Sequence, residues 1–216
     1  MLLAVVVVVV LIAASGGGDE ETTSASDAVA MFEGIPQDGV ALGDPDAPVT
    51  MAEFADLQCP FCKEFSTQAL PDIVDQYVRP GDLRIELDLL TFIGPDSDKL
   101  ARAAYAASEE DSMWQFVEAA FAEQGMEGSG YATDEFIDSL ASSVGLDGPQ
   151  LREVGASEPI SQMIADSKSA ASQAGINSTP SFQIGPTGGE LESLDVGSLE
   201  PSEFADAIDE QLAAAG

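Results

Sequence analysis

Hydrophobic and polar positions follow two different periods along the first half of the sequence. The stretch Val49–Ala55 (VTMAEFA) is short and almost wholly apolar, which indicates a buried strand. Apolar residues then recur at helical spacing from Phe61 to Tyr77, behind Pro60, which suits the first turn of a helix. Strand character returns over Leu83–Leu90. This order of strand, helix and strand predicts a parallel pair of strands joined by a right-handed crossover.

A long helical region is predicted after the second strand. Over Ser97–Gly175, apolar residues recur at helical spacing around Trp114 and several phenylalanines, which we interpret as core positions. Thr133 is suited to cap one of these helices and Pro159 to open another. Pro71 falls inside the helix before this region, and we expect a kink there because proline lacks a backbone N–H.

The last part of the chain returns to strands. Ser181–Gly185 reads as a strand, the PTGG sequence after it forms a turn, and residues 190–196 can pair back as a hairpin. Pro201 then opens a final helix, with Phe204 and Ile208 on one face. The predicted order is β-α-β, a helical insertion, and β-β-α, which is an α/β fold.

The N-terminal segment differs from the rest of the chain. Leu2–Ala14 contains 13 apolar residues, fewer than the roughly 18 that span a bilayer, and it has the length of the apolar region of a secretory signal. No lysine or arginine precedes it, and Ser15 stands where a lipoprotein signal would have cysteine. We interpret residues 1–14 as a signal peptide or an N-terminal anchor, with a buried core segment as the alternative, and residues 15–30 as a flexible acidic tether.

The charge balance excludes several classes of partner. The chain has 39 acidic residues against 7 lysines and arginines, no histidine, and a formal charge of −32. Nucleic acids and anionic membranes both require basic clusters, and this sequence has none. Such acidity fits a salty medium, where the Debye length falls to about 3 Å at 1 M salt, and it equally fits an ordinary acidic surface.

The two cysteines of the chain carry the main chemical signal. Cys59 and Cys62 form a C-x-x-C motif at the predicted start of the helix, around Pro60 and Phe61. Free backbone N–H groups and the helix dipole favour an anion at this position, so Cys59 is the predicted nucleophile and Cys62 the resolving thiol. No histidine assists and Lys63 is the only nearby base, so we expect the pKa of Cys59 to fall within the range of roughly 3.5–7.5.

Other readings of the cysteine pair are less favoured. A zinc site needs four ligands, and two cysteines without histidine cannot supply them. A purely structural disulfide would close a four-residue loop and remove little chain entropy. A hydrophobic content of 45% also provides a core that needs no disulfide.

Two further positions accompany the motif. Pro180 lies directly before the third predicted strand, where a cis peptide bond could hold the backbone of Thr179 beside the cysteines; an ordinary trans proline is the alternative. Glu53 shares an apolar face of the first strand with Val49 and Met51. Burial there would raise the pKa of Glu53 and let it carry protons for Cys62, whereas a solvated acid is the plain alternative.

Taken together, APVTMAEFADLQCPFCKEF, the helical insertion and NSTPSF resemble the DsbA-like thioredoxin-fold family of exported thiol–disulfide oxidoreductases, over roughly residues 31–212. The resemblance implies a thioredoxin fold, a central mixed sheet flanked by helices, formed by residues 31–96 and 176–216, with a helical insertion at 97–175. It also implies that Cys59 and Cys62 are catalytic, that Glu53 is the buried acid, and that Pro60, Phe61, Thr179 and Pro180 contact substrate.

The resemblance also sets expectations for function. They are an extracytoplasmic enzyme, secreted, periplasmic or at the cell surface, that passes its disulfide to exported cysteine-containing clients, with no bound cofactor or metal. A membrane oxidase of the DsbB or vitamin-K-epoxide-reductase type would reoxidise it. Phe61 replaces the histidine of the best-known oxidases, so a reductase or isomerase fed by a membrane donor stays open, as does a non-catalytic client-binding chaperone module. The short tether predicts a monomer.

Overall fold

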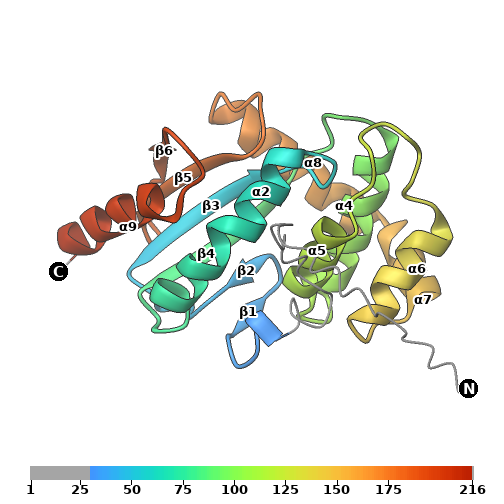
Figure 1. The fold of residues 1–216 in the computed structure, drawn as a ribbon, viewed down its shortest axis with the longest axis horizontal. Coiled ribbons are helices and arrows are strands. Elements are labelled where there is room, and N and C mark those ends of the chain that lie inside the picture. Colours follow the sequence, from blue (N-terminus) through green and yellow to red (C-terminus); the bar gives the residue numbers. More distant parts are fainter. Residues whose placement is uncertain (1–29, 216) are drawn as a thin grey trace, which may run out of the picture.

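A six-stranded mixed sheet forms the centre of the structure, a computed structural model that describes residues 30–215 (Figure 1). The strand order is β1-β2-β4-β3-β5-β6. The strands are β1 (Gln37–Asp38), β2 (Ala41–Leu42), β3 (Val49–Ala55), β4 (Leu83–Leu89), β5 (Ser181–Pro186) and β6 (Glu192–Leu194). The predictions for residues 1–14 and, apart from Ala30, for the tether at 15–30 lie outside the described residues.

The middle of the sheet confirms the predicted strand–helix–strand unit. β3 runs parallel to β4 and antiparallel to β5, and every residue of β3 is buried. β1 and β2 were not predicted from the sequence. They pair antiparallel beside β4, and two-residue strands are too short to show an alternating pattern.

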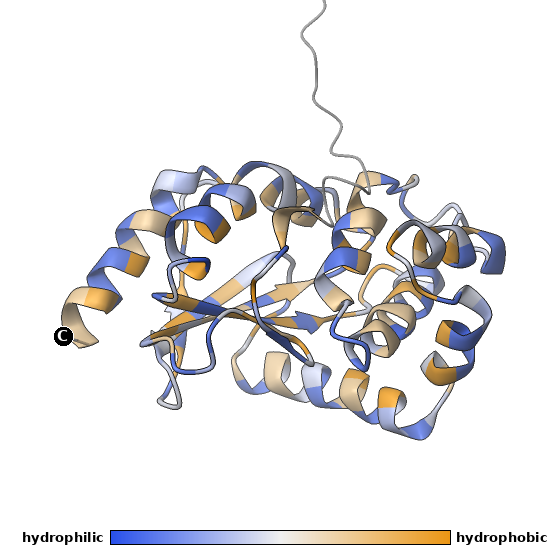
Figure 2. Ribbon diagram, turned by 90° about the horizontal axis from the view of Figure 1, so that it is seen from below, coloured by the Kyte–Doolittle hydropathy of each residue, from blue (hydrophilic) through white to orange (hydrophobic). Residues whose placement is uncertain are grey.

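Helices cover both faces of the sheet, as the view along its edge shows (Figure 2). They are α2 (Pro60–Gln68), α3 (Leu70–Ile73), the π-helix η1 (Val74–Val78), α4 (Pro95–Ser108), α5 (Met113–Ala122), α6 (Asp134–Ser143), α7 (Gly148–Gly155), α8 (Glu158–Gln173) and α9 (Pro201–Ala215). The helices of the predicted insertion, α4 to α8, gather at one end of the molecule, and α9 lies at the other (Figure 1).

The helix that carries Pro71 is interrupted rather than simply kinked. α2 ends at Gln68, α3 begins at Leu70, and the last turn widens into η1. Proline cannot donate a backbone hydrogen bond to the preceding turn, which accounts for a break at this point. The cysteine pair therefore lies on a separate nine-residue helix, α2.

Alternate residues of β3 face two different layers. Val49, Met51 and Ala55 belong to the main hydrophobic core, together with Phe65 of α2 and Phe204 of α9. On the opposite face, a smaller cluster joins Ala52 and Phe54 to Ala171 of α8. Because neighbouring side chains of a strand point to opposite faces, Glu53 faces the main core.

A chain of hydrogen bonds fastens the inserted helices to the sheet. The N–H of Leu89 donates to the Tyr105 hydroxyl at 2.8 Å, and Ser167 donates to Asp88 at 2.6 Å. Tyr105 and Ser167 are 2.6 Å apart. Since the single Ser167 proton goes to Asp88, the tyrosine must donate to the serine. The end of β4 is thereby fixed to α4 and α8, close to the cysteine loop. Within residues 30–215, no helix has both the length and the apolar character needed to cross a membrane.

Candidate active site

Cys59 and Cys62 lie at the start of α2, as predicted. Cys59 occupies the N-cap position with extended backbone angles (φ −73°, ψ 122°), and Pro60 is the first helical residue. Both cysteines are free thiols in this structure. Cys59 keeps 5% of its surface exposed and Cys62 none, so only the first sulfur can meet another protein without rearrangement.

The surroundings of Cys59 stabilise its thiolate. A hydrogen bond from the Cys62 side chain makes the largest contribution, and together with the Thr179 side chain and the backbone N–H groups of Cys62 and Phe61 it lowers the pKa of Cys59 to about 6, against the opposing effect of burial. The Cys59 side chain forms no helix-capping hydrogen bond of ordinary geometry. The expected fall in pKa is thus confirmed, but its leading cause is the second thiol rather than the helix terminus.

Cys62 has the opposite character. Burial raises its pKa well above the usual value of a thiol, and the hydrogen bond to Cys59 and the charge of Glu53 add to the effect. One sulfur of the pair is therefore an anion near neutral pH, while the other keeps its proton. This asymmetry suits a nucleophile paired with a buried resolving thiol.

The loop before β5 lies directly against the first cysteine. The Thr179–Pro180 peptide bond is cis, and Cys59, in its protonated form, donates to the carbonyl oxygen of Thr179 at 3.3 Å across 120 positions of sequence. Both features match the expectation from the sequence. A cavity of about 320 Å³ opens beside Pro180 and is lined by polar residues that include Ser178 and Asp195.

Glu53 is buried in the apolar layer under α2. Its exposed fraction is 3%, and its direct neighbours across the sheet are Leu87 of β4 and Phe182 of β5. Desolvation raises the pKa of Glu53 well above its ordinary value, with further contributions from the charges of Glu118 and Cys59. The solvated alternative is therefore wrong, because Glu53 is buried in an apolar site near Cys62.

Sequence reasoning missed Asp56, which organises the loop between β3 and α2. One carboxylate oxygen accepts hydrogen bonds from Gln58 N–H at 2.9 Å and Ser97 Oγ at 2.6 Å. The other accepts from the N–H groups of Phe92 and Ile93 at 2.9 and 3.1 Å. Nothing in its residue type distinguishes it among 39 acidic residues; its place directly after a buried strand and before the cysteines was the available signal.

Two glutamines complete the support of this loop. Gln124 donates from Nε2 to the carbonyl oxygens of Leu57 at 3.0 Å and Cys59 at 3.1 Å. Gln58 donates to Ser97 Oγ at 2.9 Å and accepts from the N–H of Gly128 at 2.8 Å. Segments that follow β4 and α5 are thus tied to the backbone on which Cys59 lies.

A second buried acid, Glu118 of α5, was also missed. It is 3% exposed, and it accepts a hydrogen bond of 2.6 Å from Ser66, a buried residue of α2. Desolvation raises the pKa of Glu118 to about 8, and the serine bond partly opposes this. Its spacing of four residues from Trp114 placed it on a core-facing stripe, which was the signal in the sequence.

Exposed apolar side chains lie around the cysteine loop. Among the described residues, the exposed large hydrophobic side chains are Phe61, Phe92 and Met126, with 60%, 50% and 77% of their surface open. Phe61 lies between the cysteines, and Phe92 is bonded through its N–H to Asp56. Met126 precedes the turn that is bonded to Gln58. We call these three side chains the apolar rim.

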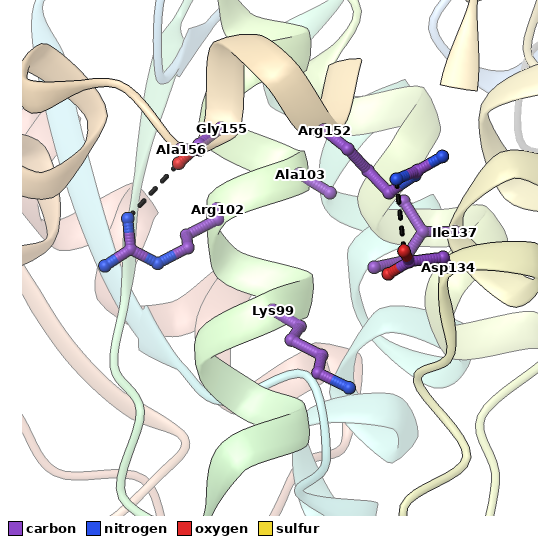
Figure 3. Close-up of a pocket in the computed structure, with 8 residues that line it drawn as sticks. All are labelled: Lys99, Arg102, Ala103, Asp134, Ile137, Arg152, Gly155 and Ala156. Carbon is purple, nitrogen blue, oxygen red and sulfur yellow. Dashed lines mark hydrogen bonds and ion pairs between the residues drawn. The ribbon is translucent and has the colours of Figure 1, made fainter. Parts of the chain in front are cut away.

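Basic residues gather elsewhere, in the helical insertion. A cavity of about 250 Å³ is lined by Lys99, Arg102 and Arg152, three of the seven cations of the chain (Figure 3). Their charged groups point away from one another in this view: Arg102 donates to the Gly155 carbonyl at 3.2 Å, and Arg152 pairs with Asp134 at 3.1 Å. These cations join helices of the insertion and do not converge on one ligand.

Across residues 30–215, no cluster of three or more histidine, cysteine, aspartate or glutamate residues has the arrangement of a metal site. The cysteine pair, the two buried acids and the cis-proline loop thus form a site whose own groups can exchange electrons through sulfur and move protons through carboxyls.

Comparison with known proteins agrees with this geometry. A family model described as thioredoxin matches residues 36–210. The probable disulfide bond formation protein D of Bacillus anthracis is 27% identical over 176 residues, which are 80% of this chain and 77% of that protein. Among solved structures, a thioredoxin-like oxidoreductase from Silicibacter pomeroyi DSS-3 is 31% identical with a TM-score of 0.64, covering 84% of this chain and 95% of that one.

Oxidised BdbD from Bacillus subtilis has the same fold, with a TM-score of 0.71 at 24% identity over 83% of this chain and 97% of that one. The predicted thioredoxin fold is therefore confirmed. The family match over most of the chain, together with the cysteine pair at the start of α2, shows that the chain belongs to the DsbA-like thiol–disulfide oxidoreductases of the thioredoxin family.

Proposed function

We propose that this protein is an extracytoplasmic enzyme that transfers a Cys59–Cys62 disulfide to exported client proteins, in the direction of disulfide formation. The observation that carries the proposal is the unequal acidity of the two thiols. A stabilised Cys59 thiolate favours the reduced enzyme, so its disulfide is the better oxidant. A pKa of about 6 at pH 7 corresponds to at most about 1.4 kcal/mol, or ~30 mV, before solvent screening.

The exchange proceeds in two balanced steps. A client thiolate attacks the sulfur of Cys59; a mixed disulfide forms, the Cys59–Cys62 bond breaks, and its electron pair goes to Cys62. Glu53 gives its proton to this buried sulfur. A second client thiolate then attacks the client sulfur of the mixed disulfide, which releases Cys59 as a thiolate. The client has lost two electrons and the enzyme has gained them.

Client recognition has two supports in the structure. The apolar rim of Phe61, Phe92 and Met126 can bind apolar side chains beside a client cysteine. The Thr179 carbonyl, 3.3 Å from Cys59 Sγ, can accept a backbone hydrogen bond from an extended client. We infer that Pro60 and Pro180 shape the same contact surface, with Phe61 as its most central apolar side chain.

The proposals for location and reoxidation are supported by the names of the relatives and by the N-terminal sequence. Relatives are named as disulfide bond formation proteins, and such chemistry requires an oxidising compartment. The apolar segment at 2–14 would direct or tether the chain there. We propose that a membrane protein of the DsbB or vitamin-K-epoxide-reductase type accepts the electrons, and that the enzyme acts as a monomer without a bound cofactor.

A redox titration of the cysteine pair in glutathione buffers tests the direction of electron flow. A potential between about −230 and −120 mV would support an oxidase, and one near −270 mV would favour the reductase alternative. That alternative has one observation in its favour, the moderate rather than extreme acidity of Cys59.

Oxidation of reduced ribonuclease by the preformed disulfide separates an enzyme from a chaperone. The enzyme should generate active ribonuclease, and Cys59→Ser should remove this activity. Client binding that is unaffected by Cys59→Ser, without any oxidation by the native protein, would favour the non-catalytic module.

A further inference from the structure

Two acids are buried near α2 without a cation, Glu53 on β3 and Glu118 bonded to Ser66 of α2. Each is 3% exposed, and the charge of Glu118 acts on Glu53. The ion pairs of the described residues all involve other carboxylates. A carboxylate that loses water without gaining a cation is costly, so this arrangement favours the protonated state of both groups.

The position of Glu118 connects it to the resolving cysteine. Cys62 and Ser66 are four residues apart on α2, so their side chains lie on the same face at a rise of about 6 Å along the axis. Both are buried, with exposed fractions of 0% and 2%. Glu118 reaches from α5 to Ser66 at 2.6 Å. One face of α2 thus carries Cys62 and, one turn later, Ser66, which donates a hydrogen bond to Glu118.

We propose that Glu118, held by Ser66, forms a coupled carboxyl pair with Glu53, and that this pair keeps the proton of Glu53 available for Cys62. The inference rests on the proposed function of the same cysteine pair. Glu118 acts through Glu53 and is therefore a positioning residue, and the electrons move only between sulfur atoms.

The charge of Glu118 affects the pH range over which Glu53 keeps its proton. The pKa of Glu118 is raised to about 8 and that of Glu53 well above its ordinary value. The negative charge that Glu118 gains on ionising opposes ionisation of Glu53 and so raises the pKa of Glu53 further. Two sites that interact in this way titrate as a pair. Glu53 can therefore protonate Cys62 over a wider alkaline range than a single buried acid could.

The groups that face the pair come from three elements. They are Glu53 of β3, Cys59 and Cys62 of α2, and Glu118 of α5, with Ser66 as the hydrogen-bonding neighbour. No lysine or arginine within residues 30–215 contributes to the shift of either carboxyl. Coupling between the two acids is thus unscreened by a local positive charge.

A titration of glutamate carboxyl carbons by ¹³C NMR on the reduced, full-length protein tests the coupling. Signals are assigned with Glu53→Gln and Glu118→Gln. In Glu118→Gln, the Glu53 midpoint should fall by roughly one pH unit, the size of interaction that couples two sites. In Ser66→Ala, the Glu118 midpoint should rise above about 8, because the serine bond lowers its pKa.

The matched control is Glu123→Gln, which removes one acid from the exposed end of the same helix region and should leave the Glu53 midpoint unchanged. An unchanged midpoint in Glu118→Gln, or an equal fall in Glu123→Gln, would overturn the proposal. If Glu118→Gln does not fold, a Glu118 midpoint that stays at its native value in Ser66→Ala overturns it instead.

The rate at which glutathione reduces the enzyme disulfide supplies the functional readout. The pH profile of this rate should fall at high pH, where Glu53 loses its proton. In Glu118→Gln this alkaline fall should move to lower pH by the same amount as the Glu53 midpoint. If the native protein exchanges disulfides but the alkaline fall is unchanged in Glu118→Gln, the coupled pair is contradicted and the proposed function stands. If the NMR shift is present but the native protein exchanges no disulfides, the proposed function fails and the coupled pair remains.

Discussion

Glu53 and Glu118 are buried near the cysteine helix α2 without a cation, whereas Asp134 and Asp138 of the helical insertion share Arg152. Desolvation raises the pKa of the first two. The Arg152 guanidinium donates two hydrogen bonds to Asp138, at 2.8 and 3.1 Å, and holds the pKa of that carboxyl below its ordinary value. Burial therefore favours protonated acidic side chains near the cysteine helix, whereas Arg152 favours the charged form of Asp138 in the insertion.

The difference lies in where the chain uses its few cations. Of seven lysines and arginines, three line the cavity in the insertion (Figure 3), where exposed ion pairs join helices. None forms an ion pair with the two buried acids near α2 in the described part of the chain. Burying a carboxylate without a cation costs stability. The same desolvation favours the protonated form of the acids near Cys62.

The largest effect is expected when the exposed sulfur of the cysteine pair near these unpaired acids is removed. Cys59→Ser should abolish exchange with reduced ribonuclease, since a hydroxyl neither ionises near pH 7 nor forms a disulfide. In Cys62→Ser, the Cys59 thiolate should attack the disulfide of scrambled ribonuclease, release one client thiolate and retain the client as a mixed disulfide, visible on non-reducing gels. Turnover in Cys59→Ser would contradict the assignment of the nucleophile.

The buried carboxyl of Glu118 should also control how the free energy of unfolding depends on pH. Glu118 is protonated in the folded protein up to about pH 8 but in the unfolded chain only up to about 4.5. Folding thus takes up a proton between these values, and the free energy of unfolding falls as pH rises through this window, by up to about 5 kcal/mol.

Glu118→Gln should remove this part of the pH dependence. Urea denaturation at pH 5 and at pH 8 measures it: the native protein should weaken more than the variant between the two values. The Glu123→Gln control should behave like the native protein. Parallel curves for Glu118→Gln and the native protein would show that Glu118 ionises freely.

A smaller effect is expected at Thr179, in the loop before β5. The Thr179 side chain is one of several donors that lower the pKa of Cys59, so Thr179→Val should raise that pKa by a fraction of the whole shift. The pH dependence of alkylation by iodoacetamide measures it, with a midpoint that moves upward from about 6. Below the new midpoint, the variant should react more slowly than the native protein. A midpoint that stays in place would assign the stabilisation to Cys62 and the helix N-terminus alone.

The smallest effect should come from the insertion. Arg152→Gln removes the partner of Asp134 and Asp138, and their carboxylates then meet water, because the pair lies at the surface. Exposed ion pairs contribute little, so thermal melting should change only slightly and the ribonuclease assay should not change. A loss of exchange activity in this variant would mean that the cation cluster and the cysteine site are coupled.

Much of the architecture could be predicted because it depends on local pattern. The apolar run of Val49–Ala55 appears with the predicted bounds, and the helix opened by Pro60 begins where predicted but ends earlier, at Gln68. Thr133 caps α6 by accepting the N–H of Phe136 at 3.2 Å. β1 and β2 escaped prediction, since their strand character exists only through pairing with β4.

The candidate active site likewise has features that the sequence predicted and features that it did not. The motif and its position on the helix followed from sequence, as did the cis bond before Pro180 and the burial of Glu53. Asp56 and Glu118 did not, because an acid gains its role from the hydrogen bonds and desolvation that distant segments impose. Asp56 is held by groups from as far as Ser97, and Glu118 by a serine 52 positions away.

By itself, the sequence determined where a thiolate could form, because adjacent residues create a helix terminus and place one cysteine on its cap. The tertiary structure alone decided how acidic that thiol is and which carboxyls stay protonated near it. Those properties depend on solvent exclusion and on side chains brought together from β3, α2, α5 and the loop before β5. Local pattern encodes a helix or a strand, but the cost of burying a charge is set only once the whole core has closed around it.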